Sequence, residues 1–107
     1  MWGTRTTAAP RPRPAQVKRS IVLADGTDRI VLYSWGASDA RRVENLARLG
    51  PGAAVRWRAE LPAGTGSDCF VDVRLDDGAV VAATWSGATL RLDADTGRPF
   101  PPLGVVA

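Results

Sequence analysis

The stretch Cys69-Phe70-Val71-Asp72-Val73-Arg74-Leu75-Asp76-Asp77-Gly78 decides the fold class of this chain. Its residues alternate between two sides, with Cys69, Val71, Val73 and Leu75 on one and Phe70, Asp72 and Arg74 on the other. Successive side chains of a β-strand point to opposite faces, so this period of two predicts a half-buried strand. The Asp77-Gly78 pair that follows is typical of a hairpin turn.

The same period of two recurs along the chain and predicts an all-β domain. Val55, Trp57, Ala59 and Leu61 alternate with charged residues. Residues 30–35 and 80–85 are largely apolar and predict central strands buried on both faces. Turn residues separate eight expected strands, at about 19–24, 29–35, 43–49, 54–61, 69–75, 79–85, 88–93 and 98–101. The helical alternative covers residues 38–49, where three aliphatic residues fall at helical spacing.

Two copies of one four-strand unit make up the predicted domain, residues 20–61 and 69–101. Each copy has an Asp-Gly turn after its first strand and a Trp at the end of its second. The matching residues are Trp35 with Trp85, at an offset of 50, and Arg48, Leu49 and Trp57 with Arg91, Leu92 and Phe100, at an offset of 43. The difference places an insertion of seven residues in the first copy, within residues 36–42.

Repeats of this length with four strands each are typical of propeller blades. Two blades cannot close a ring. We therefore expect two antiparallel, four-stranded, blade-like meanders, packed as a small sandwich or joined as one curled sheet. Assembly of several copies into a closed ring, and an origin as the end of a longer gene, remain open alternatives.

One turn resembles a known repeat. Leu90-Arg91-Leu92-Asp93-Ala94-Asp95-Thr96-Gly97-Arg98 is similar to the turn of bacterial PQQ-like β-propeller repeats, and Val55-Arg56-Trp57 resembles the strand that closes such a repeat. The first copy departs from the pattern, because Gly50-Pro51-Gly52 stands where the aspartates should be. The resemblance implies a blade. It carries over no quinone or metal ligand, since members that bind the cofactor use residues from many blades.

The composition excludes several kinds of chemistry. The chain has 107 residues, a formal net charge of +3, no histidine and one cysteine. Without histidine it lacks the commonest general base and the commonest metal ligand. One cysteine excludes a disulfide framework and Cys-rich zinc sites. We expect no enzymatic activity, no cofactor and no metal.

The positive charge is concentrated in residues 1–19, an Arg- and Pro-rich leader that we expect to be disordered or polyproline-like. Its cationic residues are Arg5, Arg11, Arg13, Lys18 and Arg19, and it has no acidic residue. Residues 20–107 have nine basic against eleven acidic residues, a net charge of −2. The leader has no apolar segment of a secretory signal, and no run is long enough for membrane insertion, so we expect a cytoplasmic protein. A basic arm, a transit peptide and a misassigned start remain alternatives for this leader.

Five aromatic residues are candidates for a ligand surface: Trp35, Trp57, Trp85, Phe70 and Phe100. They recur at equivalent positions of the two copies, which favours a role in filling the space between the sheets. Arg56 and Arg58 lie on the face opposite Trp57 and predict cross-strand ion pairs rather than a nucleic-acid surface.

Four further motifs have structural interpretations. The oxygen ligands of Asp93 and Asp95 suggest calcium, but the rest of a calcium loop is missing, so a plain turn is expected. Cys69, after Ser67-Asp68, has no histidine to activate it and predicts a buried hydrophobe. Residues 64–67 lack the lysine of a phosphate loop. Asp76-Asp77 sits at a hairpin turn, where its two carboxylates point apart.

These observations favour a non-catalytic β-domain that binds a protein partner or associates with itself. No site residue is assigned to it, and the partner and oligomeric state stay open. The first alternative is a small-ligand-binding or enzymatic domain that uses the 36–45 insertion, with polar groups from Tyr33, Asp39, Arg41, Glu44 and Asn45. A further alternative is weak binding of nucleic acid or an anionic surface through the basic leader. The net charge of the remaining chain makes nucleic acid an unfavourable partner.

Overall fold

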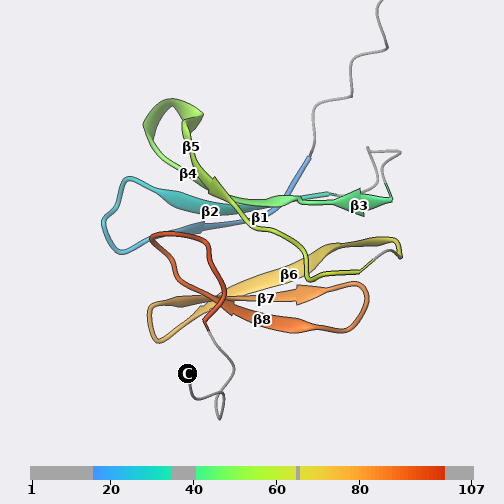
Figure 1. Cartoon of the computed structure of the whole chain (residues 1–107). Coiled ribbons are helices and arrows are strands. Elements are labelled where there is room, and N and C mark those ends of the chain that lie inside the picture. The colour runs from blue at the N-terminus through green and yellow to red at the C-terminus, as the bar shows by residue number, and fades with distance from the viewer. Residues whose placement is uncertain (1–15, 35–40, 65, 101–107) are drawn as a thin grey trace, which may run out of the picture.

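The computed structural model describes residues 16–34, 41–64 and 66–100, which form two four-stranded β-sheets facing each other (Figure 1). The all-β prediction is confirmed. The strands are β1 (Val17–Val22), β2 (Arg29–Tyr33), β3 (Arg42–Val43), β4 (Leu46–Leu49), β5 (Val55–Arg58), β6 (Asp68–Asp76), β7 (Ala79–Thr84) and β8 (Thr89–Leu92). The helical element of the described chain is a 3-10 turn, Pro51–Ala53, and no described helix is long and apolar enough to span a bilayer.

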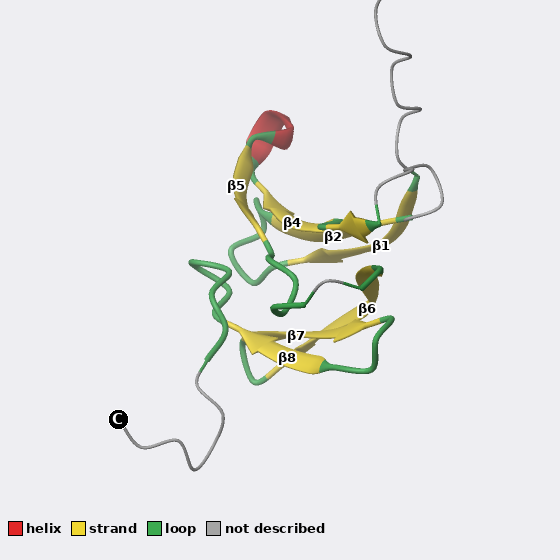
Figure 2. Ribbon diagram, turned by 45° about the vertical axis from the view of Figure 1, so that its right-hand side comes forward, coloured by secondary structure: helices red, strands yellow, loops and turns green. Residues whose placement is uncertain are grey.

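The first sheet is an antiparallel meander in the order β1-β2-β4-β5, and it is strongly curved (Figure 2). Ile30, Leu32 and Leu46 point from it into the space between the sheets. Val31 and Ala47 point the other way and are buried as well. Strand β2 is therefore buried on both faces, as its continuous apolar sequence predicts.

The second sheet has the order β3-β6-β7-β8 and is mixed, because β3 runs parallel to β6. The expected strand 43–49 is thus split between the two sheets. Asn45 lies at the crossing, where its Nδ2 donates to the carbonyls of Tyr33 (2.7 Å) and Phe70 (2.8 Å). Its Oδ1 accepts the Phe70 N–H at 2.8 Å. The helical alternative for residues 38–49 is wrong over its described part, 41–49.

The core between the sheets is built from residues of both sheets. Its fully buried members include Ile30, Leu32, Leu46, Phe70, Val73, Val80, Ala82 and Leu92. Phe70 and Val73 share this face although the sequence alternation separates them. A β-bulge between Phe70 and Asp72 shifts the register of β6, so the strict alternation of residues 69–75 does not hold there.

The aromatic residues divide into two groups. Trp57 and Phe70 are buried in the core, as predicted. Trp85 is 67% exposed and Phe100 is 43% exposed, so the prediction that they fill the space between the sheets is wrong. Trp85 lies in the hairpin turn after β7, and Phe100 lies beside the edge of β8, beyond the packed faces. Trp35 lies outside the described residues.

The gapless alignment of the two copies is not a structural equivalence. Leu92 points into the core, whereas its aligned partner Leu49 belongs to the apolar cluster on the outer face of the first sheet. Arg48, paired in the ladder with the core residue Ile30, consequently points inward. The expected strand 98–101 is represented, up to residue 100, by a single bridge between Leu92 and Pro99.

Candidate binding groove beside strand β8

The turn at residues 93–97 follows β8 of the second sheet and contacts the first sheet at one end of the sandwich (Figure 1). Its geometry comes from the sequence: the Asp93 carboxylate accepts the Asp95 N–H at 2.8 Å, and the Gly97 N–H donates to the Asp93 carbonyl at 2.7 Å. Gly97 has a φ of 74°, which favours glycine. The Asp93 carboxylate therefore shapes a turn, and the described residues contain no cluster of three or more side chains that could hold a metal ion.

Two side chains of the first sheet hold this turn. The indole N–H of Trp57 and the Nη1 of Arg48 each donate to the Ala94 carbonyl at 2.8 Å. Both side chains face inward from neighbouring strands, since Arg48 and Trp57 are ladder partners in β4 and β5. The turn of the second sheet is thus fixed on the inner face of the first.

A charged cluster lies beside this contact. Asp28, whose side chain is 4% exposed, accepts from Arg48 Nε at 2.7 Å and from Arg56 Nε at 3.2 Å. Arg48 also reaches Asp25 at 3.2 Å and Asp95 at 3.4 Å. The hydrogen bond from Arg48 lowers the pKa of Asp28. The carboxylate is consequently a poor proton acceptor near neutral pH, and the cluster neutralises charge rather than providing a general base.

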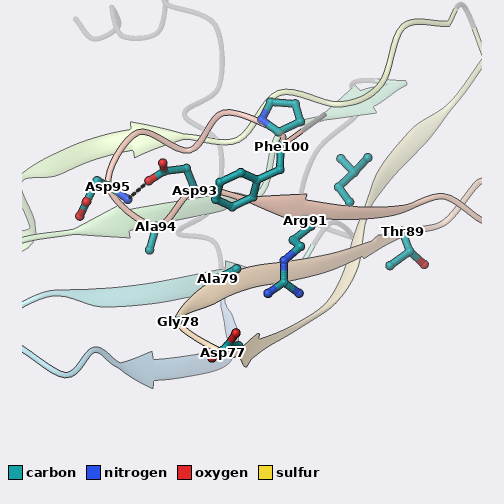
Figure 3. A pocket seen from close by; sticks show the side chains of 11 residues that line it. Asp77, Gly78, Ala79, Thr89, Arg91, Asp93, Ala94, Asp95 and Phe100 are labelled. Carbon is teal, nitrogen blue, oxygen red and sulfur yellow. Dashed lines mark hydrogen bonds between the residues drawn. The ribbon is translucent and has the colours of Figure 1, made fainter. Parts of the chain in front are cut away.

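Next to the cluster, a groove of about 920 Å³ runs along the edge of β8 (Figure 3). Asp95 lines both this groove and the smaller hollow, of about 280 Å³, that the charged cluster surrounds. The apolar part of the groove is formed by Ala79, Leu90, Ala94, Pro99 and Phe100. Its charged residues are Asp77, Asp93, Asp95 and Arg91.

The charge of the groove is negative. The Arg91 guanidinium is already held by Asp76, through Oδ2 at 3.2 Å and the backbone carbonyl at 3.1 Å. The Asp93 and Asp95 side chains lie together at one side, with the Phe100 ring beside Asp93, and Asp77 lies on the other side of β8 (Figure 3). An apolar surface between carboxylates suits a ligand that is apolar or cationic.

The backbone of β8 is partly paired at this edge. The Phe100 N–H donates to the Arg91 carbonyl at 2.8 Å, and the Asp93 N–H donates to the Arg98 carbonyl at 2.8 Å. Residues 98–100 therefore pair with the edge of β8 at Arg91 and, just beyond the strand, at Asp93.

One protein family matches the part of the chain that contains both the charged cluster and the groove. Residues 16–100 match a domain of unknown function, DUF7957. The chain belongs to this family. The DUF7957 match includes all eight strands, the charged cluster and the groove, and residues 1–15 lie outside it. No curated protein and no solved structure matched the chain.

Of the residues suggested by the insertion, those that the structure describes do not converge on a site in this DUF7957 domain. The Asn45 amide is fully engaged by three backbone groups that connect the sheets. Tyr33 packs on the outer face of the first sheet. Arg41 and Glu44 are exposed, and Asp39 lies outside the described residues.

The remaining motifs have structural positions. Cys69 is buried, and burial raises the pKa of its thiol, which disfavours the reactive thiolate. Burial raises the pKa of Asp68, but hydrogen bonds from Ser86 and the Cys69 N–H outweigh it and lower the pKa overall. The glycine-containing segment 64–67 lies in a loop, where Arg42 donates to the Gly66 carbonyl.

Arginines of the described strands do form ion pairs, but not between neighbouring strands as predicted, and Arg58 has none among the described residues. Arg56 pairs with Asp28, Arg74 with Asp76 at 3.8 Å, and Arg19 with Asp72 at 3.4 Å. The sequence does not indicate the groove. Its apolar residues Leu90 and Ala94 would be equally expected in a buried core. The charged cluster was not anticipated either, because the alternation of residues does not show that Arg48 faces inward toward Asp28.

Proposed function

We propose that this domain is a non-catalytic protein-binding module whose groove beside β8 takes an extended segment of a partner chain. The observation that carries the proposal is the groove itself, about 920 Å³ of largely apolar surface next to a strand edge. Its volume lies at the upper end of the range of ligand-binding clefts, and phenylalanine, here the exposed Phe100, is enriched at protein interfaces.

The strand edge favours a chain segment over a small molecule as the ligand. Thr89 and Arg91 lie two residues apart in β8, so their backbone groups face the same edge. The Arg91 carbonyl accepts from the Phe100 N–H, and within the described residues the pairing of this edge stops at Phe100. An added strand from a partner would supply a donor to the Thr89 carbonyl.

The ionisable side chains near the groove support a binding role. Those of the charged cluster are engaged in ion pairs, and Arg91 is held by Asp76. The hydrogen bond from Arg48 lowers the pKa of Asp28, so this carboxylate stays charged near neutral pH and exchanges protons poorly. A surface of this kind recognises a partner by shape and charge.

Selection from a peptide library tests the proposal. Random peptides displayed on phage are selected on the immobilised full chain, and the enriched peptides are measured against two variants. Phe100→Ser, which removes the ring from the groove, should weaken binding by about tenfold or more. Trp85→Ser removes a still more exposed aromatic residue outside the groove and should leave binding unchanged. Failure to enrich any peptide, or equal binding to wild type and Phe100→Ser, would overturn the proposal.

A further inference from the structure

We infer that the groove beside β8 takes the Arg- and Pro-rich leader of a second copy of this chain, so that copies assemble head to tail. This inference rests on the proposed function and names the ligand. The leader segment is Pro10-Arg11-Pro12-Arg13-Pro14. The groove that receives it is lined by Asp77, Asp93, Asp95 and Phe100.

Charge complementarity is the first argument. Residues 1–15 contain Arg5, Arg11 and Arg13 and no acidic residue. The groove presents three carboxylates, while its one cation is bound to Asp76. Asp95 lies 3.4 Å from Arg48 Nη1, but its side chain is 89% exposed, so the carboxylate can still be reached by an incoming guanidinium. Arginine pairs well with carboxylates because its planar fork donates two parallel hydrogen bonds.

Backbone stiffness is the second argument. Three prolines stand at alternate positions of the leader, and proline favours extended, polyproline-like backbone because its ring fixes φ. A segment that is already extended loses little entropy on binding, which is why proline-rich ligands dock against aromatic surfaces in other modules. Pro99 and the exposed ring of Phe100 provide such a surface in the groove.

The position of β1 excludes the chain's own groove as the target of this segment. Val17 pairs with Tyr33, at the end of β2 far from Arg29. The carboxylate end of the groove, with Asp93 and Asp95, lies at the opposite end and the opposite edge, where Ala94 contacts Trp57 of β5. Strand spacing, strand length and sheet separation put the two corners about 24 Å apart through the core.

The chain between Arg11 and Val17 is too short for that path. Six residues of polyproline helix span about 19 Å, and the path over the surface is longer than the direct line. The Arg-Pro segment therefore reaches the groove of a neighbouring copy. A contact between different surfaces of two copies repeats head to tail, which gives a ring or an open chain.

Mixing two full-length variants tests the inference by light scattering. The leader variant carries Arg5→Ser, Arg11→Ser and Arg13→Ser. The groove variant carries Asp77→Asn, Asp93→Asn and Asp95→Asn; asparagine retains the turn hydrogen bond at residue 93 and tolerates the positive φ of residue 77. Glu60→Gln removes an exposed carboxylate outside the groove and serves as the charge control.

Wild type and Glu60→Gln should associate at low salt and dissociate as salt is added. Each triple variant should be monomeric alone, and their mixture should form a complex of two chains, because one supplies a groove and the other a leader. A wild type that stays monomeric, a leader variant that still associates, or a mixture without a complex would overturn the inference. Peptides selected on a monomeric wild type would then leave the proposed function standing.

Discussion

Arg48 and Trp57 donate hydrogen bonds to the same acceptor, the Ala94 carbonyl, at 2.8 Å each. This shared acceptor connects the inner face of the first sheet to the turn that borders the groove. The contact is close: a Cβ atom placed on Gly97, in the same turn, would lie 2.5 Å from the Trp57 ring. The position of the groove therefore depends on how tightly this turn packs against Trp57.

A Gly97→Ala substitution tests that packing. The substitution should lower the free energy of unfolding for two reasons, the positive φ of 74° and the clash of the new Cβ with Trp57. Gly26→Ala is the matched control, because Gly26 has a φ of 77° and nothing within 4 Å of its added Cβ. We expect Gly26→Ala to lower the free energy of unfolding by about 1–2 kcal/mol. Gly97→Ala should lower it by about 1–3 kcal/mol more, measured by urea denaturation. Equal losses would contradict the proposed packing.

Asn45→Ala tests the connection between the sheets. The substitution leaves the N–H and carbonyl of Phe70 and the carbonyl of Tyr33 without the side-chain partner. Because a buried polar group left unpaired costs about 1–3 kcal/mol, the free energy of unfolding should fall by at least about 2 kcal/mol. Glu44→Ala, at the exposed neighbouring position, should change it by less than about 0.5 kcal/mol in the same denaturation experiment. Similar values for the two variants would show that Asn45 does not hold the sheets together.

The sequence predicts the fold class and the central strands because both depend on local pattern. Residues 30–33 and 79–82 are apolar at successive positions, and each segment lies within a central strand of its sheet. The Asp77-Gly78 turn was likewise predictable, since both residues adopt the positive φ that this hairpin requires.

The site was not predictable because it depends on register and on contacts distant in sequence. The bulge at Phe70 and the crossing at Asn45 change which face a residue occupies, and neither leaves a mark in the alternation. Arg48 illustrates the result. Its aligned partner Arg91 faces outward. Arg48 instead points between the sheets, where it donates to the Asp28 carboxylate and to the Ala94 carbonyl.

Acid should destabilise the domain through its paired aspartates. The pKa of Asp28 is lowered from 3.8 by the hydrogen bond from Arg48, and that of Asp25 by the N–H groups of Asp28 and Thr27. A lowered folded pKa means that the unfolded chain binds protons more readily. The stabilisation is therefore complete above about pH 5 and is lost as the pH falls through the folded pKa values.

Urea midpoints measured from neutral to acidic pH check this expectation. Because the chain has no histidine, the midpoint should stay constant between about pH 5 and 8 and fall below that range. Asp28→Asn should be less stable at neutral pH and show a shallower acid decline, since one of the shifted carboxylates is gone. Glu60→Gln controls for the removal of a carboxylate outside the cluster. A decline of undiminished steepness in Asp28→Asn would show that Asp28 does not contribute to the acid sensitivity.

The two described tryptophans should contribute unequally to stability. Trp57 is 8% exposed and makes the hydrogen bond to Ala94, whereas Trp85 is 67% exposed in a hairpin turn. Trp57→Ala removes a core side chain and should lower the free energy of unfolding by about 3–5 kcal/mol. Trp85→Ala should change it by no more than about 0.5 kcal/mol, because an exposed side chain leaves no cavity. Urea denaturation followed by circular dichroism compares them independently of tryptophan fluorescence. A large loss in Trp85→Ala would restore the equivalence of the two residues that the sequence repeat suggests and that their exposure contradicts.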